Sequence, residues 1–340
     1  MTTSFLTLRD GDVIKLDKAT DYHRPAHVID RRSVVAINAA LATGRPLLVR
    51  GEPGVGKSQL ARAAAVQLGR RFRHHAVDAS TEPRDLLYTV DAVARLAEAQ
   101  LVGALGKGTR NDVAIDKFIR PGALWWAFDW GGAAAQEQRA VGTGTAGGRT
   151  RDLALTTDPD GTPANRGAVL LIDEIDKADS AIPNALLDAL GHRRFDVPGF
   201  GMVEMKGEWP LVIITTNEER ALPDAFLRRC FVLHLGLPDD AGEAAVREAL
   251  RVRGKAHFPG CESGILKQAA ELIARRRSQQ RNLGSERVPP PGVAEYIDLI
   301  DAVLGQRSEG GDAIALLNEI AMFVLDKHAQ PASVASERDA

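Results

Sequence analysis

The sequence has 340 residues, of which 44% are hydrophobic and 26% charged, and its formal net charge is −2. This composition excludes intrinsic disorder of the whole chain, and the small charge gives no global attraction to nucleic acid or anionic membranes. No apolar run reaches the ~18–20 residues that a membrane span needs. The two cysteines fit no metal-site or disulfide pattern, and the first residues lack a signal-peptide pattern, so we expect a cytoplasmic protein.

Short apolar runs alternate with helical patterns through the first two thirds of the chain. Four runs are typical of strands buried on both faces of a parallel sheet: residues 46–50, 168–172, 211–215 and 231–235. Helical patterns follow the first two runs, and residues 195–203 alternate around two glycines as a hairpin does. The sequence therefore predicts an α/β domain over residues 1–236, with a parallel sheet flanked by helices.

Three further segments complete the predicted organisation. Helical patterns without intervening strands predict a small all-helical domain over residues 237–328, and residues 329–340 are expected to be a flexible tail. Residues 131–167 are rich in Gly, Ala, Thr and charged residues and have almost no periodicity. We interpret that stretch as a mobile insertion in the α/β domain.

The strongest chemical signal is the segment Gly51-Glu52-Pro53-Gly54-Val55-Gly56-Lys57-Ser58, followed by Gln59. It fits G-x-x-x-x-G-K-[ST] and lies between a predicted strand and a predicted helix, which disfavours a merely structural loop. Backbone N–H groups of such a loop bind a polyphosphate, and a Cβ at Gly51 or Gly56 would block its approach. Lys57 is expected to reach the β- and γ-phosphates, and the Ser58 hydroxyl to ligate Mg²⁺.

An acidic pair, Asp173 and Glu174, follows the buried run at 168–172. Ligands bind at the carboxyl ends of parallel strands, so this pair is expected near the phosphate loop. Asp173 suits the Mg²⁺ shell through water, and Glu174 is placed to polarise an attacking water. The alternative is an acidic turn that caps the next helix.

Polar and basic residues follow the third buried run. Asn217 lies two residues beyond this run and is a candidate for positioning the attacking water. The alternative is an ordinary turn at the end of the strand. Arg228 and Arg229 precede the fourth run; they are either surface charges or include an arginine that senses the γ-phosphate.

Two other clusters have a structural and a functional interpretation. The basic runs at 70–75 and 275–277 are expected to be solvated helix ends rather than nucleic-acid contacts. The tryptophans at 125, 126 and 130 are expected in core or subunit packing rather than in base stacking.

The order of GEPGVGKS, LLIDEIDKAD, the FDVPGFG hairpin, IITTN and LPDAFLRRC resembles a MoxR-type AAA+ ATPase over about residues 25–330. The resemblance implies Asn217 as sensor 1, Arg228 or Arg229 as a finger acting on a neighbour's ATP, and the helical domain as a lid. The family's sensor 2 arginine has Arg287 as its nearest equivalent, although Arg287 precedes the prolines that open the helix. The resemblance also implies inserts facing the ring pore, at 85–105 and 195–210.

The expected activity is hydrolysis of ATP to ADP and phosphate, with ATP and Mg²⁺ as ligands, coupled to remodelling of a protein partner. The resemblance implies a homo-oligomeric ring, such as a hexamer, and a partner with a von Willebrand factor A domain; nucleic acid is not expected. The alternative is a nucleic-acid-directed P-loop motor of a restriction or defence system. A third hypothesis is a slowly hydrolysing nucleotide switch with a scaffold role.

Overall fold

The computed structural model describes residues 5–16, 25–105, 113–140, 167–178, 181–282, 289–306 and 311–325. The chain divides into two compact units. The first, the α/β unit, comprises residues 1–51 and 57–235. The second, the helical unit, comprises residues 236–340 together with the loop residues 52–56. The two units are described separately below.

A five-stranded parallel sheet forms the centre of the α/β unit, with strand order β11-β3-β10-β7-β4. The strands are β3 (Leu47–Arg50), β4 (Arg71–Ala76), β7 (Ala168–Asp173), β10 (Leu211–Thr216) and β11 (Phe231–His234). The three central strands are apolar and almost wholly buried, as their sequence runs predicted. The predicted fold class, a P-loop α/β sheet flanked by helices and followed by a helical region, is confirmed.

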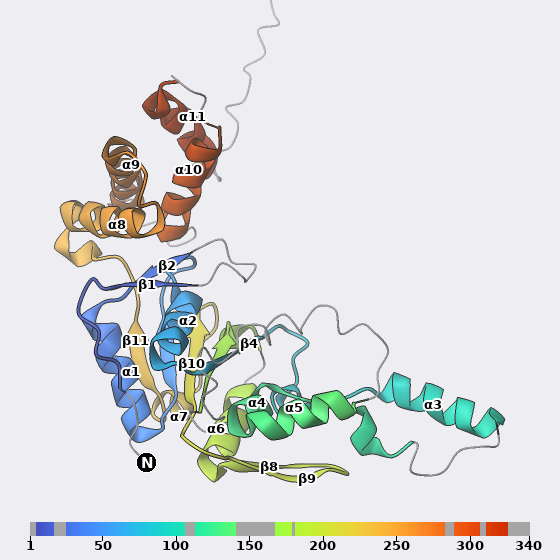
Figure 1. Cartoon of the computed structure of the whole chain (residues 1–340). Coiled ribbons are helices and arrows are strands. Elements are labelled where there is room, and N and C mark those ends of the chain that lie inside the picture. The colour runs from blue at the N-terminus through green and yellow to red at the C-terminus, as the bar shows by residue number, and fades with distance from the viewer. Residues whose placement is uncertain are drawn as a thin grey trace, which may run out of the picture. The chain divides into compact units, whose positions relative to one another are not determined.

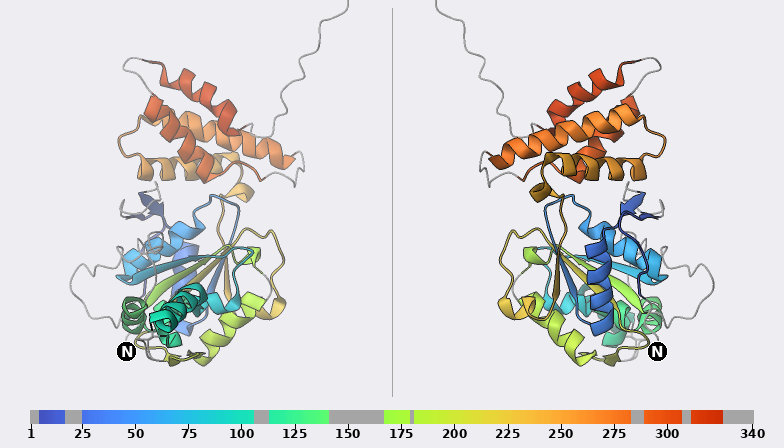
Figure 2. Two further views of the ribbon diagram at one scale, coloured as in Figure 1. Left: turned by 90° about the vertical axis from the view of Figure 1, so that its right-hand side faces the viewer. Right: turned by 90° about the vertical axis from the view of Figure 1, so that its left-hand side faces the viewer.

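Helices cover both faces of the sheet (Figures 1 and 2). One face carries α1 (Arg31–Thr43) and α2 (Lys57–Leu68); the other carries α4 (Ala123–Phe128), α5 (Trp130–Arg139) and α6 (Ala181–His192). Side chains alternate between the faces along each strand. Leu170 and Ile172 of β7 therefore join the core cluster of α4 and α6, while the equally buried Val169 and Leu171 lie on the face that carries α2, which contacts β7.

Three antiparallel ribbons lie outside the sheet. They are β1 (Val13–Lys15) with β2 (Ala26–Val28), β5 (Tyr88–Val90) with β6 (Ile119–Pro121), and β8 (Arg194–Val197) with β9 (Gly201–Glu204). The third ribbon confirms the hairpin predicted at 195–203. Short 3₁₀ helices are η1 (Pro83–Leu86), η2 (Ile115–Phe118) and η5 (Ile175–Lys177).

Two sequence predictions are wrong in part. The helical period of residues 85–105 predicts a helix over that segment, but β5 occupies part of it and pairs with β6 before α3 (Ala92–Leu105) begins. The segment 131–167 is not wholly an insertion without order, because residues 131–139 belong to α5. Asp129 caps this helix by accepting from the Gly132 N–H at 2.9 Å, and the buried Gln136 donates to two backbone carbonyls. Residues 141–166 lie outside the described residues.

The basic run at 70–75 is not a solvated helix end, because it forms β4 at the edge of the sheet. Arg70 is buried and donates to Glu208 Oε2 at 2.7 Å and to the Trp209 carbonyl at 2.9 Å. Arg71 and Arg73 lie over the rings of Trp130 and Trp126, with guanidinium-to-centroid distances of 5.3 and 5.1 Å. The tryptophans therefore pack in the core, as expected, and Trp125 and Trp126 are fully buried.

The helical unit contains η6 (Asp239–Ala241), α8 (Glu243–His257), α9 (Ser263–Asn282), α10 (Val293–Gln306) and α11 (Ala313–Leu325). Their apolar faces share one core, with Leu250, Ile273, Ile300 and Leu317 fully buried. Residues 326–340, where the tail was predicted, are outside the described part of the chain. Within the described ranges, none of the helices has the length and apolar character required to cross a membrane.

Candidate nucleotide-binding site

The predicted site residues converge at the carboxyl edge of the parallel sheet. Strand β10 lies between β3 and β7, and all three run in the same direction. Their next residues are Gly51 after β3, Glu174 after β7 and Asn217 after β10. Gly51 and Gly56 have positive φ angles of 150° and 103°, which a residue with a Cβ rarely adopts, so both positions need glycine as the sequence analysis argued.

Lys57 opens helix α2 and is 7% exposed. Its Nζ donates to the Gly51 carbonyl at 2.6 Å and to Asn217 Oδ1 at 2.7 Å. Burial lowers the pKa of Lys57, although the carboxylates of Asp173 and its neighbours oppose that shift. The ammonium is thus held between the phosphate loop and β10, ready to contact an anion.

Asp173 accepts hydrogen bonds from three surrounding elements. Ser58 Oγ lies 2.9 and 3.1 Å from its two carboxylate oxygens, His74 Nε2 of β4 lies 3.3 Å away, and the Thr215 hydroxyl of β10 donates to Oδ1. Burial by itself would raise the pKa of Asp173, but the hydrogen bonds from these three residues outweigh it and hold the pKa below its usual range.

The oxygen donors of Ser58 and Asp173 fit a magnesium ion. Mg²⁺ prefers hard oxygen ligands and is commonly held by one or two protein groups together with phosphate oxygens. A hydroxyl and a carboxylate side by side next to the phosphate loop match this pattern. Among the described residues, no group of three His, Cys, Asp or Glu side chains could hold a metal ion.

Glu174 has a left-handed backbone, with φ of 60° and ψ of 49°. This conformation is uncommon for a residue other than glycine and is found disproportionately at functional sites. Its carboxylate binds Lys177 Nζ at 2.6 Å and accepts from Asn217 Nδ2 at 3.3 Å. Asn217 therefore contacts both Lys57 and Glu174, which links the phosphate-binding cation to the predicted base.

Three polar residues at this edge were not among the predicted site residues: His74, Asp176 and Thr215. Asp176 is 2% exposed, and its Oδ2 accepts from the backbone N–H groups of Asn217 and Glu219. Thr215 is fully buried. The sequence signal for Thr215 was a hydroxyl inside an apolar strand, whereas His74 gave no signal within its basic run.

Arg228 and Arg229 lie at the opposite edge of the sheet. They follow helix α7 (Asp224–Leu227) and precede β11, whose first residue, Phe231, pairs with the first residue of β3. They are therefore at the amino edge, separated from the carboxyl edge by the length of the strands, about 13 Å for four residues at ~3.3 Å each.

Both arginines are exposed, and neither side chain has a hydrogen-bond or ion-pair partner within the described ranges. The structure does not bring them to the carboxyl edge of the sheet in their own α/β unit. Arg287 lies outside the described residues. In the helical unit, the prediction of a solvated helix end at 275–277 is wrong for Arg277, which lies within α9, is 2% exposed and binds both carboxylate oxygens of Asp239 at 2.5 and 2.6 Å.

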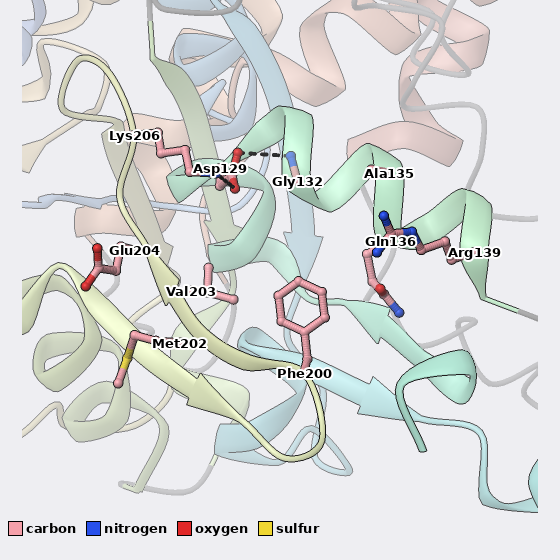
Figure 3. Close-up of a pocket in the computed structure, with 10 residues that line it drawn as sticks. All are labelled: Asp129, Gly132, Ala135, Gln136, Arg139, Phe200, Met202, Val203, Glu204 and Lys206. Carbon is pink, nitrogen blue, oxygen red and sulfur yellow. Dashed lines mark hydrogen bonds and ion pairs between the residues drawn. The ribbon is translucent and has the colours of Figure 1, made fainter. Parts of the chain in front are cut away.

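A separate cavity of about 470 Å³ lies between α5 and the β8–β9 hairpin (Figure 3). Phe200 and Met202 of the hairpin line it and are 38% and 50% exposed. Asp129 and Lys206 form an ion pair of 2.7 Å at its margin. None of the predicted nucleotide-site residues lines this cavity, so it is a different feature of the α/β unit.

The phosphate loop, the acidic pair and the polar strand end define a P-loop nucleoside-triphosphatase site. Residues 46–230, more than half of the chain, match the family model described as AAA domain (dynein-related subfamily). The chain therefore belongs to this family of AAA+ ATPases. No curated protein matches the chain.

Solved structures with low sequence identity also align with the chain. A predicted ATPase of Cytophaga hutchinsonii is 14% identical, with a TM-score of 0.35, over 86% of this chain and 79% of that one. The RuvB Holliday junction branch migration motor of Thermotoga maritima is 16% identical, with a TM-score of 0.39, over 85% of this chain and 67% of that one. At these scores the alignments add nothing to the assignment of function.

Proposed function

We propose that the chain is a MoxR-like AAA+ ATPase that hydrolyses ATP to ADP and phosphate within a homo-oligomeric ring, such as a hexamer, and uses the energy to remodel a protein partner. The observation that carries the proposal is the distribution of charge over the sheet. Lys57, Asp173 and Glu174 are gathered at the carboxyl edge, while Arg228 and Arg229 are exposed at the amino edge. A site that needs both sets requires two copies of the chain.

In this proposal each residue at the carboxyl edge has one role. The phosphate loop and Lys57 bind and neutralise the phosphates, and Ser58 and Asp173 hold Mg²⁺, which screens the phosphate charge when bound. Glu174 accepts a proton from the attacking water, and Asn217 orients that water or the γ-phosphate. Arg229, or Arg228, reaches the ATP of the neighbouring copy and stabilises charge in the transition state.

A protein partner is supported by exposed apolar side chains on two projecting elements. Val93, Leu96 and Leu101 of α3 are 80%, 61% and 56% exposed, and Phe200 and Met202 stand at the cavity beside the hairpin. Contiguous exposed apolar groups mark contact surfaces for other proteins. The family resemblance makes a protein with a von Willebrand factor A domain the proposed partner, and the cytoplasm the proposed location.

The activity is tested by measuring phosphate release from Mg-ATP and Mg-GTP by the full chain, with Lys57→Ala as the inactive control. We expect ATP to be preferred, because the sequence contains no guanine-reading motif. Preferential turnover of GTP would favour the nucleic-acid motor instead.

The partner is tested by capture on Glu174→Gln loaded with Mg-ATP, a variant expected to bind ATP and release phosphate slowly. Recovery of a protein that dissociates when ATP is removed supports the remodelling role. Recovery of DNA in place of protein would contradict it.

A further inference from the structure

Thr215 occupies the position in β10 next to the end of β7, and its side chain is fully buried. Its Oγ accepts from the backbone N–H of Glu174 at 2.9 Å and donates its proton to Asp173 Oδ1. One hydroxyl therefore contacts both acidic residues of the site. Ser58 and His74 also contact Asp173.

The hydrogen bond from Glu174 to Thr215 is made at a residue whose backbone conformation is unfavourable. A left-handed residue with a side chain persists only when its surroundings fix it, and Glu174 is in that conformation. If the N–H lost its acceptor, a partly buried donor would be left unsatisfied and the left-handed turn would lose a restraint. The direction of the Glu174 carboxylate depends on that turn.

The loop after β10 is restrained by a side chain from the segment after β7. Asp176, which follows β7, accepts from the backbone N–H groups of Asn217 and Glu219, which follow β10. Glu218 between them is also left-handed, with φ of 63°. Thr215 at the end of β10 thus restrains the backbone after β7, and Asp176 after β7 restrains the backbone after β10.

We propose that Thr215 is a positioning residue for ATP hydrolysis: its hydroxyl fixes the Asp173 carboxylate toward the metal position and the Glu174 backbone toward the attacking water. This inference rests on the ATPase activity proposed above. Thr215 acts through Asp173 and Glu174 and does not itself contact nucleotide. Residues that orient a metal ligand in this way commonly change metal affinity or activity by about 10–100-fold when substituted.

The test uses three substitutions at Thr215 and one next to it. Thr215→Val removes the hydroxyl and keeps the shape, and Thr215→Ser keeps the hydroxyl and removes the methyl group. Thr215→Ala differs from Thr215→Ser only by the hydroxyl, so the Ala–Ser comparison is available if the Val variant does not fold. Thr216→Val is the matched control, because Thr216 is equally buried but accepts from the Glu218 N–H instead.

Three quantities are measured on the full chain: kcat and KM for ATP, the Mg²⁺ concentration that half-saturates the signal of a fluorescent ATP analogue, and amide hydrogen exchange of the peptide covering residues 172–176. For Thr215→Val and Thr215→Ala we expect kcat to fall about 10–100-fold, the Mg²⁺ requirement to rise and exchange at Glu174 to accelerate. The KM for ATP is expected to stay within about threefold, since the phosphate loop is untouched. Thr215→Ser and Thr216→Val are expected to resemble the wild type.

A kcat for Thr215→Ala equal to that of Thr215→Ser, or an equal loss in Thr216→Val, would overturn the inference. Unchanged exchange at Glu174 in the variants without the hydroxyl would overturn it as well. A wild-type chain that binds ATP but releases no phosphate would instead overturn the proposed activity, and the exchange measurement would still report on the Thr215 contact.

Discussion

The two edges of the parallel sheet differ in how their charged groups are held. At the carboxyl edge Lys57 and Asp173 are largely buried and bonded to side chains or backbone of neighbouring elements. At the amino edge Arg228 and Arg229 are exposed, with no ion-pair partner among the described residues. The first edge is preorganised within one chain. The second presents cations whose function, in our account, depends on another copy.

The largest expected effect concerns the carboxyl edge. Lys57→Ala removes the cation that lies between the Gly51 carbonyl and Asn217, so the β- and γ-phosphates lose their counter-charge. Thermal unfolding with Mg-ATP is expected to show no stabilisation in the variant. The wild type should gain about 2.7 kcal/mol at an ATP concentration 100 times its Kd. A normal ATP-dependent shift in Lys57→Ala would remove this residue from phosphate binding.

The next effect concerns the amino edge. Arg229→Ala is expected to bind ATP normally and to lose about 10³-fold or more of kcat, because an arginine acting across a subunit boundary stabilises transition-state charge. Arg228→Ala is measured in parallel, because either arginine is a candidate for this role. If both variants keep the wild-type kcat, the two arginines are surface charges and the contrast between the edges has no catalytic meaning.

Glu174→Gln should have a smaller effect on kcat, on the order of 10²-fold, and little effect on binding. The amide keeps the shape of the side chain and loses its basicity, while the phosphate loop is unchanged. Single-turnover phosphate release and ATP binding measured on the same preparation separate the two steps. An equal loss of binding would mean that Glu174 is needed to hold the site together and is not its base.

The smallest effect concerns the accessibility of the buried residue Cys230, which follows the exposed arginines at the amino edge. Burial raises the pKa of Cys230, the residue after Arg229, to about 12, so the reactive thiolate is scarce at pH 8. Cys261 is partly exposed. A thiol reagent is expected to modify Cys261 at pH 8 and to leave Cys230 largely unmodified in the native protein. Fast modification of Cys230, located by peptide mass, would mean that the start of β11 opens readily.

The sequence predicted which strands meet at the carboxyl edge because each of them has a clear sequence pattern. β7 and β10 are uninterrupted apolar runs, and the residues after them are polar. The phosphate loop has a pattern long enough to be specific. Parallel strands bring such ends together, so Lys57, Asp173 and Asn217 were expected near one another before any distance was known.

The sequence did not predict features that depend on contacts between distant segments. His74 lies in a run that resembled a charged surface, and only the pairing of β4 with β7 brings it to Asp173. Helix α5 has two glycines in its first turn and a weak helical pattern, yet Asp129 caps it and Gln136 anchors it to the carbonyls of Asp116 and Ile119. Tertiary contacts override local preference at such positions.

Mixing Arg229→Ala with Lys57→Ala shows whether a complete hydrolytic site combines the carboxyl edge of one copy with the amino edge of another. Neither variant alone has an interface with both residues intact, whereas mixed assemblies contain some. Under conditions where exchange of subunits has been demonstrated, we expect the mixture to regain ATPase activity above that of either pure variant. The parallel mixture with Arg228→Ala identifies which arginine acts. No recovery in either mixture, despite exchange and despite losses in the single variants, would contradict the claim.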